Sequence, residues 1–171
     1  MQKRQEIGLK PSTLNWIYDF LKGRLQRVKL SPRIFSNWKP VNAGVPQGTK
    51  LGPWLFLLMI KDLAIYNDQF VGDMMKYADD TNVSEYIVDH NDDSSLQQVT
   101  DSIVDWSRRN KFQLNLSKCK EFFVSFKRNQ PNFPTISTNG SQIERVEKLS
   151  ILGLSITRDL KWNDHVDKIV N

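Results

Sequence analysis

The sequence predicts an α+β layered domain, and three observations support this prediction. The chain has 171 residues, within the range of roughly 100–200 residues typical of one domain. Hydrophobic residues make up 39% of the chain and aromatic residues 11%, which is enough large apolar side chain to build a core. Segments with the apolar spacing of helices are mixed with short segments typical of strands, without an internal repeat.

The first part of the chain predicts two helices joined by extended structure. Ser12–Lys22 has apolar residues at helical spacing and is followed by a glycine. Arg24–Val45 has strand-like residues with breaks, and Gly44–Gly48 contains two glycines and a proline, which are typical of a loop. Leu51–Tyr66 then predicts a mostly buried helix, in which Pro53 is tolerated because it falls in the first turn.

The middle of the chain predicts two short strands followed by the clearest helix. Phe70–Val88 forms the strands, with a turn at Ala78-Asp79-Asp80. Ser95–Asn110 is the helix, and Ser95 and Gln98 are predicted to form its capping box. Two acids precede its positive end, namely Asp92 and Asp93. Its apolar stripe consists of Leu96, Val99, Ile103 and Trp106.

The last part of the chain predicts mostly strands. Phe112–Phe126 is rich in strand formers, and Asn139-Gly140 is typical of a type I′ hairpin turn. Leu149–Ile156 predicts another strand. An amphipathic helix begins near Trp162, and its apolar residues include Val166, Ile169 and Val170.

Charge is distributed unevenly along the chain. Phe20–Lys61 contains eight Lys and Arg and no acid, a charge of +8. Asp62–Asp105 contains eleven acids against Lys76, a charge of −10, and Trp106–Gln130 contains seven bases and one acid, a charge of +6. This layout indicates either a polyanion-binding surface around an acidic, cation-holding centre or a set of solvated faces with charged helix ends.

Several classes of protein are disfavoured. The single cysteine, Cys119, excludes an internal disulfide framework and is typical of a small core residue. The longest apolar run, Leu51–Ile60, is shorter than the ~20 residues of a membrane-spanning helix, and the first residues do not resemble a secretory signal. His90 and His165 lack partners at the spacing of a zinc site.

Three features could carry chemistry. In Tyr77-Ala78-Asp79-Asp80, a turn would let two adjacent carboxylates converge on Mg²⁺, although Asp is also common in ordinary polar turns. The Pro46-Gln47-Gly48 loop before a helix could bring backbone N–H groups close to phosphate, or it could be a rigid connection. Lys118 could stabilise or protonate a leaving phosphate, or it could be a surface lysine.

The order of these motifs resembles the reverse transcriptase of non-LTR (LINE-type) retrotransposons. Gly44-Val-Pro-Gln-Gly-Thr-Lys-Leu-Gly-Pro-Trp-Leu-Phe56 resembles motif B of that family, and Lys76-Tyr-Ala-Asp-Asp-Thr81 resembles motif C. Trp106–Lys120 resembles motif D, and Leu149–Ile156, with Leu152-Gly153, resembles motif E. Together these segments extend the resemblance from about Gly8 to about Val170.

The resemblance implies a partial palm of a right-hand polymerase, an antiparallel sheet with helices packed on one face. Residues 1–148 would form the partial palm, and residues 149–171 would hold the motif E strand and the start of a thumb or connecting helix. The implied metal ligands of a two-ion Mg²⁺ site are Asp79 and Asp80, and the implied catalytic lysine is Lys118. The substrate-binding residues would be Pro46, Gln47, Gly48, Tyr77 and Ala78. The nucleic-acid-binding residues would be Arg24, Arg27 and Lys29, because the basic stretch would follow the nucleic-acid backbone.

The implied activity is RNA-directed synthesis of DNA from deoxynucleoside triphosphates, with a DNA primer on an RNA template. Motif A and the fingers should lie upstream of the first helix, so we expect this chain to be inactive without them. Thr49, Lys50 and Trp54 depart from the small or aliphatic residues associated with motif B. Two alternatives are a non-catalytic RNA- or DNA-binding remnant and a relic with an unpaired sheet edge. The family also implies an intracellular and nuclear location, with no membrane partner.

Overall fold

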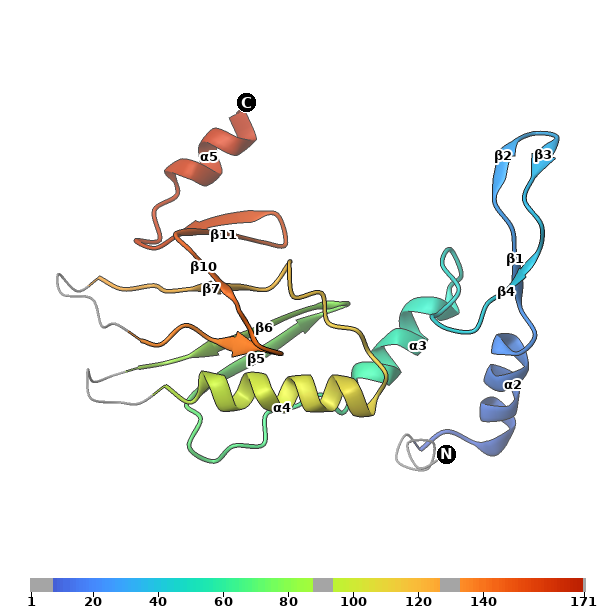
Figure 1. Cartoon of the computed structure of the whole chain (residues 1–171), viewed down its shortest axis with the longest axis horizontal. Coiled ribbons are helices and arrows are strands. Elements are labelled where there is room, and N and C mark those ends of the chain that lie inside the picture. The colour runs from blue at the N-terminus through green and yellow to red at the C-terminus, as the bar shows by residue number, and fades with distance from the viewer. Residues whose placement is uncertain (1–7, 88–93, 127–132, 171) are drawn as a thin grey trace. The chain divides into compact units, whose positions relative to one another are not determined.

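The computed structural model describes residues 8–87, 94–126 and 133–170 (Figure 1). The chain divides into two compact units, Met1–Asp62 and Leu63–Asn171. The acids Asp92 and Asp93, predicted at the start of the third helix, lie outside the described residues. None of the described helices is sufficiently long and apolar to cross a membrane.

The first unit begins with helix α2 (Pro11–Leu21) and ends with helix α3 (Leu51–Ile60). Proline starts α2 because its missing N–H would have no helical partner there. Four short strands lie between the helices, namely β1 (Leu25–Gln26), β2 (Lys29–Ser31), β3 (Ile34–Phe35) and β4 (Lys39–Pro40). Both helices were predicted, but α3 is shorter than the expected Leu51–Tyr66 helix.

The four strands form one long two-stranded ribbon, which we call the basic ribbon (residues 25–40). Strand β1 pairs antiparallel with β4, and β2 pairs antiparallel with β3. Between these pairs, the Val28 N–H donates to the Ser36 hydroxyl oxygen at 2.8 Å, and the Ser36 N–H donates to the Val28 carbonyl at 2.9 Å. These bonds keep the two chains together where strand pairing is interrupted.

The second unit contains a hairpin, the longest described helix and several short strand pairs. Strands β5 (Gly72–Tyr77) and β6 (Asp80–Glu85) form the hairpin, and α4 (Leu96–Arg109) follows. The later elements are β7 (Lys120–Phe122), β8 (Ser137–Thr138), β9 (Ser141–Gln142), β10 (Glu144–Val146), β11 (Lys148–Ile151), β12 (Leu154–Thr157) and α5 (Asn163–Val170).

The mixture of helices and strands agrees with the predicted α+β class, but the strands do not form one antiparallel sheet. In the described part of the chain, they form six two-stranded sheets, two of which follow one another along the basic ribbon, and one pair, β10 with β7, is parallel. The short pairs leave most strand edges without a third strand. The continuous palm-like sheet implied by the resemblance is therefore not present in these ranges.

Two local predictions were wrong. The capping box at α4 does not form, because the Ser95 hydroxyl donates to Glu85 Oε1 at 2.7 Å and makes no cap bond to the helix. The segment predicted as one strand over Leu149–Ile156 is a hairpin in which Ile151 pairs with Leu154. Its turn residues, Leu152 and Gly153, have φ values of 48° and 89°.

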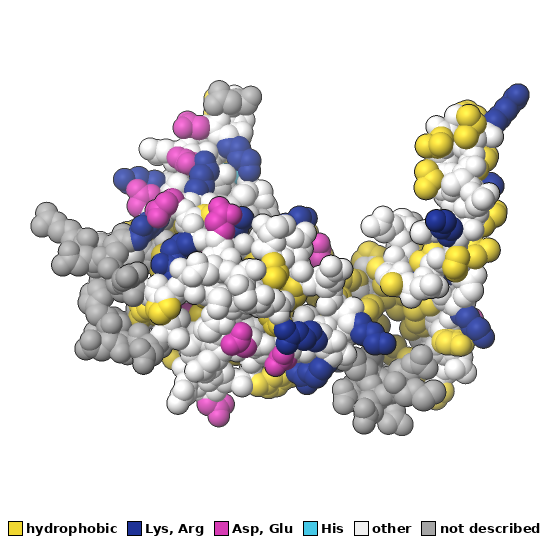
Figure 2. Space-filling view, viewed as in Figure 1, with side chains coloured by type: hydrophobic (Ala, Val, Ile, Leu, Met, Phe, Trp, Pro, Cys, Tyr) yellow, Lys and Arg dark blue, Asp and Glu magenta, His cyan; other side chains and the backbone are white. Residues whose placement is uncertain are grey.

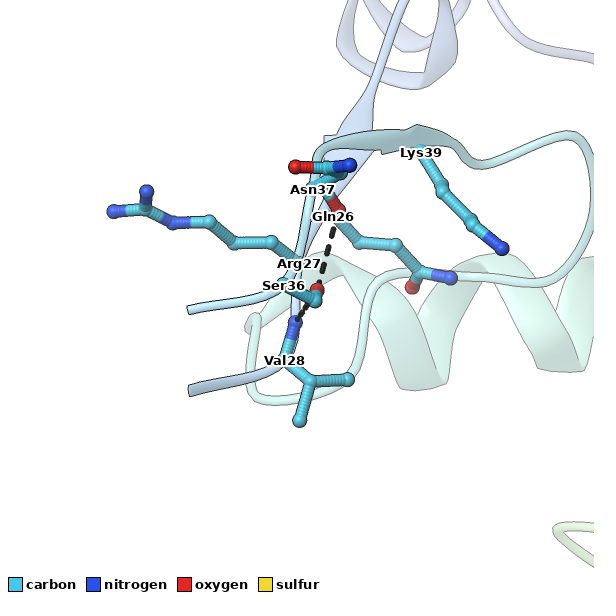
Figure 3. A pocket seen from close by; sticks show the side chains of 6 residues that line it. All are labelled: Gln26, Arg27, Val28, Ser36, Asn37 and Lys39. Carbon is cyan, nitrogen blue, oxygen red and sulfur yellow. Dashed lines mark hydrogen bonds between the residues drawn. The ribbon is translucent and has the colours of Figure 1, made fainter. Parts of the chain in front are cut away.

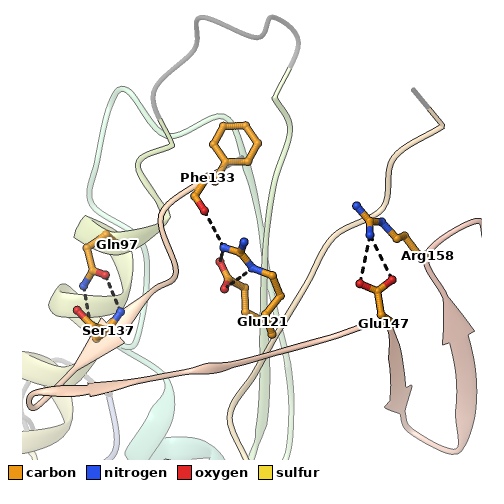
Figure 4. A network of polar contacts seen from close by, with 7 residues as sticks. Gln97, Glu121, Phe133, Ser137, Glu147 and Arg158 are labelled. Atoms are coloured by element: carbon orange, nitrogen blue, oxygen red, sulfur yellow. Dashed lines mark hydrogen bonds and ion pairs between the residues drawn. The ribbon is translucent and has the colours of Figure 1, made fainter. Parts of the chain in front are cut away.

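The predicted turn at Asn139-Gly140 is confirmed. The two residues have φ values of 50° and 78°, as a type I′ turn requires, and they join β8 to β9. Helix α4 is linked to β8 by Gln97, whose amide donates to the Ser137 carbonyl at 2.8 Å and accepts from the Ser137 N–H at 2.9 Å (Figure 4). The side chain therefore satisfies backbone groups at an exposed strand edge.

The small core of the second unit is built on α4. Its buried apolar side chains are those of Leu63, Val99, Val104, Trp106 and Ile136. The ring of Trp106 stacks on that of Phe112, with 5.2 Å between the ring centroids. Of the predicted stripe, Val99 and Trp106 are buried, whereas Leu96 and Ile103 are half-buried.

Candidate active site

The two predicted metal-binding acids lie at the turn of the β5–β6 hairpin. Tyr77 pairs with Asp80, so Ala78 and Asp79 form a two-residue turn. Ala78 has a φ of 50°, a left-handed conformation that costs an L-residue roughly 1–2 kcal/mol. Two-residue hairpin turns need a positive φ at their first residue, which here is Ala78. The pairing of β5 with β6 therefore determines the backbone position of Asp79 and Asp80.

The carboxylates of Asp79 and Asp80 are exposed and have no partner in the part of the chain that the structure describes. Both residues are accessible to solvent. Within the described ranges, neither side chain makes a hydrogen bond or an ion pair. Two adjacent carboxylates without a cation repel each other, and a divalent cation relieves that repulsion. The turn is therefore suited to binding a cation that arrives from solution.

The hairpin is held by contacts along both of its strands. Lys76 donates from Nζ to the Leu63 carbonyl at 2.8 Å. Glu85 accepts the Ser95 N–H at 2.8 Å, which ties the end of β6 to the start of α4. A Cβ at Gly72 would lie 2.0 Å from the Ser84 carbonyl oxygen, so only glycine fits this position. These contacts hold the hairpin beside its turn, at Lys76, and at its base, at Gly72 and Glu85.

A third carboxylate does not join Asp79 and Asp80 in the described part of the chain. No group of three or more His, Cys, Asp or Glu side chains able to hold a metal ion occurs in those ranges. The site as described therefore supplies two carboxylates. Mg²⁺ in phosphate-handling sites is usually held by one or two carboxylates together with water and substrate phosphates.

The Pro46-Gln47-Gly48 loop is folded against the start of α3. The Thr49 hydroxyl donates to the Pro46 carbonyl at 2.9 Å and accepts the Gly52 N–H at 3.1 Å. A Cβ at Gly52 would lie 2.5 Å from the Pro46 carbonyl oxygen, so glycine is needed for this close approach. Thr49, which differs from the small or aliphatic residues associated with motif B, therefore provides a hydroxyl that caps the start of α3 and holds the loop against it. The side chain of Gln47 is exposed.

The predicted catalytic lysine, Lys118, lies in a turn of the second unit. Its N–H donates to the Asn115 carbonyl at 3.0 Å, and its side chain is exposed. Within the described residues, no hydrogen bond or ion pair joins it to Asp79 or Asp80. The neighbouring Cys119 is half-buried, and this burial raises the pKa of its thiol.

The three predicted nucleic-acid-binding residues differ in their surroundings. Arg24 donates to the carbonyls of Leu21, at 3.4 Å, and Gly44, at 3.3 Å, so its guanidinium is bound to the chain itself. The Arg27 guanidinium lies over aromatic rings of the basic ribbon, and the Lys29 ammonium is 5.8 Å from the centroid of one of them. Sequence reasoning did not identify these rings, which belong to Phe35 and Trp38.

The structure therefore groups the predicted site residues into separate local arrangements. Tyr77, Ala78, Asp79 and Asp80 share one turn in the second unit. Pro46, Gln47 and Gly48 share one loop in the first unit. Sequence reasoning missed Gly52 and the structural role of Thr49, although a Thr three residues before a helical glycine is a typical capping signal.

A carboxylate turn, a glycine-containing loop at a helix start and a basic ribbon are typical of proteins that bind polyanions with divalent cations. The family comparison is more specific. The family model for reverse transcriptase (RNA-dependent DNA polymerase) matches residues 1–156, and the chain belongs to this family.

Relatives from fruit flies agree with this assignment. The chain is 31% identical over 142 residues to the RNA-directed DNA polymerase from mobile element jockey of Drosophila melanogaster, a match that covers 78% of this chain and 15% of that protein. It is 29% identical over 153 residues to the probable RNA-directed DNA polymerase from transposon X-element of the same species, a match that covers 88% of this chain and 16% of that protein. The chain thus spans less than a fifth of these relatives, and no solved structure matches it. The resemblance to LINE-type reverse transcriptases is confirmed.

Proposed function

We propose that this chain supplies part of the nucleotidyl-transfer site of an RNA-directed DNA polymerase that extends a DNA primer on an RNA template. The observation that carries the proposal is the β5–β6 turn, which holds Asp79 and Asp80 side by side, exposed and unpaired among the described residues. Membership of the reverse transcriptase family supports the reaction class.

The donor set at this turn fits Mg²⁺. Asp79 and Asp80 offer hard oxygen ligands, and their exposure leaves room for water and substrate phosphates. When bound, the cation would neutralise phosphate charge and activate the attacking hydroxyl. In the proposal, the role of the protein is to keep the two carboxylates together at the hairpin turn.

The other predicted residues would position the substrates. In the proposal, Pro46, Gln47 and Gly48 lie against the incoming nucleotide, and Tyr77 and Ala78 flank the reacting ends. The exposed ammonium of Lys118 would donate a proton to the departing pyrophosphate. The geometry that supports the loop assignment is its folding onto α3, which leaves the Gln47 side chain open to solvent.

The proposal requires a carboxylate from outside the described residues. Two-metal transfer uses acids from more than one strand, and the described ranges provide two at one turn. We therefore propose that the 171-residue chain alone extends primers poorly, and that a motif A and fingers segment completes the site. This part of the proposal is tested by restoring an upstream segment that carries an aspartate after a hydrophobic strand.

The test has a binding step and an activity step. Mn²⁺ added to the 171-residue chain should broaden the NMR signals of the hairpin turn first, and Asp79→Asn should weaken that effect. Asp68→Asn, which removes an exposed acid away from the turn, is the control. An upstream-extended chain should extend a primer with Mg²⁺, and Asp79→Asn should abolish the extension. Primer extension that is indifferent to Asp79→Asn would refute the catalytic assignment.

A non-catalytic role in binding RNA or DNA remains the second candidate function. The observation that favours it is the basic ribbon, whose cations Arg27 and Lys29 make no ion pair within the described residues. Salt-dependent RNA binding by the 171-residue chain would support this role, whether or not the chain has polymerase activity.

A further inference from the structure

The basic ribbon has side chains that its own fold does not use. Five of its large apolar side chains are more than half exposed, namely those of Leu25 at 58%, Val28 at 61%, Leu30 at 76%, Ile34 at 58% and Trp38 at 58%. A ribbon of two strands is marginally stable by itself, because neither face is covered. The exposed rings and aliphatic groups therefore form a surface available to a partner.

The charge of this surface indicates which kind of partner it would bind. The ribbon carries Arg27, Lys29, Arg33 and Lys39, and the sequence has no acid from Phe20 to Lys61. In Figure 2 the ribbon, at the upper right, shows yellow hydrophobic and dark-blue basic side chains and no magenta acid. A surface that is both aromatic and entirely basic is complementary to nucleic acid, and much less so to a neutral protein surface.

Arg27 is held in place by aromatic rings. Its guanidinium carbon lies 3.9 Å from the centroid of the Phe35 ring and 4.5 Å from that of Trp38. Within the described part of the chain, its N–H groups have no hydrogen-bond acceptor. A guanidinium that is fixed by stacking and keeps its donors free is prepared to bind a phosphate, since little side-chain freedom remains to be lost.

The basic ribbon also has a shallow cavity. It has a volume of about 190 Å³ and is lined by Gln26, Arg27, Val28, Ser36, Asn37 and Lys39. Figure 3 shows Arg27 extending to one side of the ribbon, and Gln26 and Lys39 extending to the other. Neither Phe35 nor Trp38 lines this cavity, so the space is separate from the ring cluster that holds the Arg27 guanidinium.

We propose that the basic ribbon is a binding site for unpaired RNA, in which a base stacks on Trp38 and a neighbouring phosphate binds Arg27. An unpaired strand is favoured over a duplex because only unstacked bases expose the faces that rings and guanidinium planes contact. The inference rests on the proposed function only in the choice of RNA. The binding itself needs neither Asp79 nor Asp80.

The test measures the fluorescence anisotropy of a labelled single-stranded oligouridine titrated with the 171-residue chain. Trp38→Ala should weaken binding at least about fivefold, the lower end for loss of one stacked base. Trp162→Ala removes a similarly exposed ring, 62% against 58%, and should leave the affinity within about twofold of the parent, because no base stacks there. Equal losses in the two variants, or no RNA binding by the parent chain, would overturn the proposal.

The salt dependence of binding distinguishes the contribution of the Arg27 charge from that of stacking on Trp38. Arg27→Gln should lower the slope of log affinity against log salt by about 0.7, the value for one phosphate of a single strand. Lys111→Gln removes one exposed charge elsewhere and should not change the slope. Trp38→Ala should weaken binding while leaving the slope unchanged. An unchanged slope in Arg27→Gln would refute the phosphate contact.

Two further experiments test whether the loss of affinity comes from misfolding, and whether the site prefers single-stranded RNA to a duplex. Trp38→Phe retains a ring and should retain most of the affinity, whereas Trp38→Leu retains only apolar volume and should bind as weakly as Trp38→Ala. The same RNA annealed into a duplex should be insensitive to Trp38→Ala. A duplex affinity that falls as much as the single-strand affinity would overturn the stacking assignment. Asp79→Asn should bind RNA like the parent, so failure of the catalytic proposal would remain separate.

Discussion

The ion pair between Glu121 and Arg145 provides a sharp test of how the second unit is held together. The Glu121 side chain is 4% exposed and that of Arg145 is 31% exposed. Arg145 donates from Nε to Glu121 Oε2 at 3.0 Å and from Nη2 to Glu121 Oε1 at 3.2 Å. It also donates to the Phe133 carbonyl at 3.0 Å (Figure 4). Its guanidinium lies over the Phe123 ring. The pair joins β7 to β10, the parallel strand pair.

Arg145→Met should destabilise the chain because it leaves the buried Glu121 carboxylate without its cation. Breaking a buried pair costs about 3–5 kcal/mol, and the partial exposure of Arg145 reduces the expected loss to about 2–3 kcal/mol. The free energy of unfolding is measured by urea denaturation followed by circular dichroism. Arg108→Met is the control, because Arg108 and its partner Asp105 are 62% and 66% exposed, and it should cost less than about 1 kcal/mol.

A double variant isolates the cause of that loss. Glu121→Leu combined with Arg145→Met removes both charges and should recover most of the lost stability, since apolar pairs of similar volume replace buried ion pairs well. The reasoning is refuted if Arg145→Met costs no more than Arg108→Met. It is equally refuted if the double variant is less stable than Arg145→Met alone.

Three other predictions follow from local contacts. Gly52→Ala should cost about 1–3 kcal/mol in urea denaturation, because its Cβ would lie 2.5 Å from a loop carbonyl oxygen. The hydrogen bond from Lys161 lowers the pKa of Asp159 to about 2, so this pair stabilises the fold above the ordinary pKa of the acid and loses its effect as pH falls through about 2. An NMR titration should show the Asp159 midpoint rising toward 3.8 in Lys161→Ala. The hydrogen bond to Asp73 raises the pKa of Tyr86, so its contribution is present below the ordinary value and is lost as pH rises through the raised one. Asp73→Asn should lower the Tyr86 midpoint in an ultraviolet titration.

Local turn chemistry was predictable where the residue type itself demanded the conformation. Asn139-Gly140 and the turn at Asp79 were both predicted as turns, and both join antiparallel strands. The turn at Leu152-Gly153 was missed because leucine is not a turn residue, yet its φ is 48°. Strand pairing of β11 with β12 on both sides imposes that conformation against the local preference.

The length of α3 was not predictable from apolar content. After Lys61 and Asp62 the chain is apolar again from Leu63 to Tyr66, and apolar residues indicate burial without showing what the side chains are buried against. Leu63 is buried and belongs to the second unit, whereas Leu55 and Ile60 are buried in α3 of the first. The apolar residues that were predicted to form one helix therefore belong to two units, and α3 ends near the boundary between the units.

In the candidate site too, features set by neighbouring residues were predictable, whereas features set by distant residues were not. The turn at Ala78-Asp79 was predictable because neighbouring residues specify it, and Tyr77 pairs with Asp80 across it. The helix cap of α4 was not, because Glu85, which binds the Ser95 N–H, lies 10 residues earlier in the chain. A pattern search within one helix cannot find a capping carboxylate supplied by a neighbouring strand.

The arginines of the basic stretch show why net charge alone could not assign roles. Arg24 and Arg27 are three residues apart and contribute equally to the +8 charge. The Arg24 guanidinium donates hydrogen bonds to the carbonyls of Leu21 and Gly44, so it joins the end of α2 to the loop before α3. Arg27 is stacked on rings and keeps its donors free within the described residues. Arg24→Gln should therefore lower the stability of the first unit, while Arg27→Gln should lower RNA affinity and leave stability nearly unchanged.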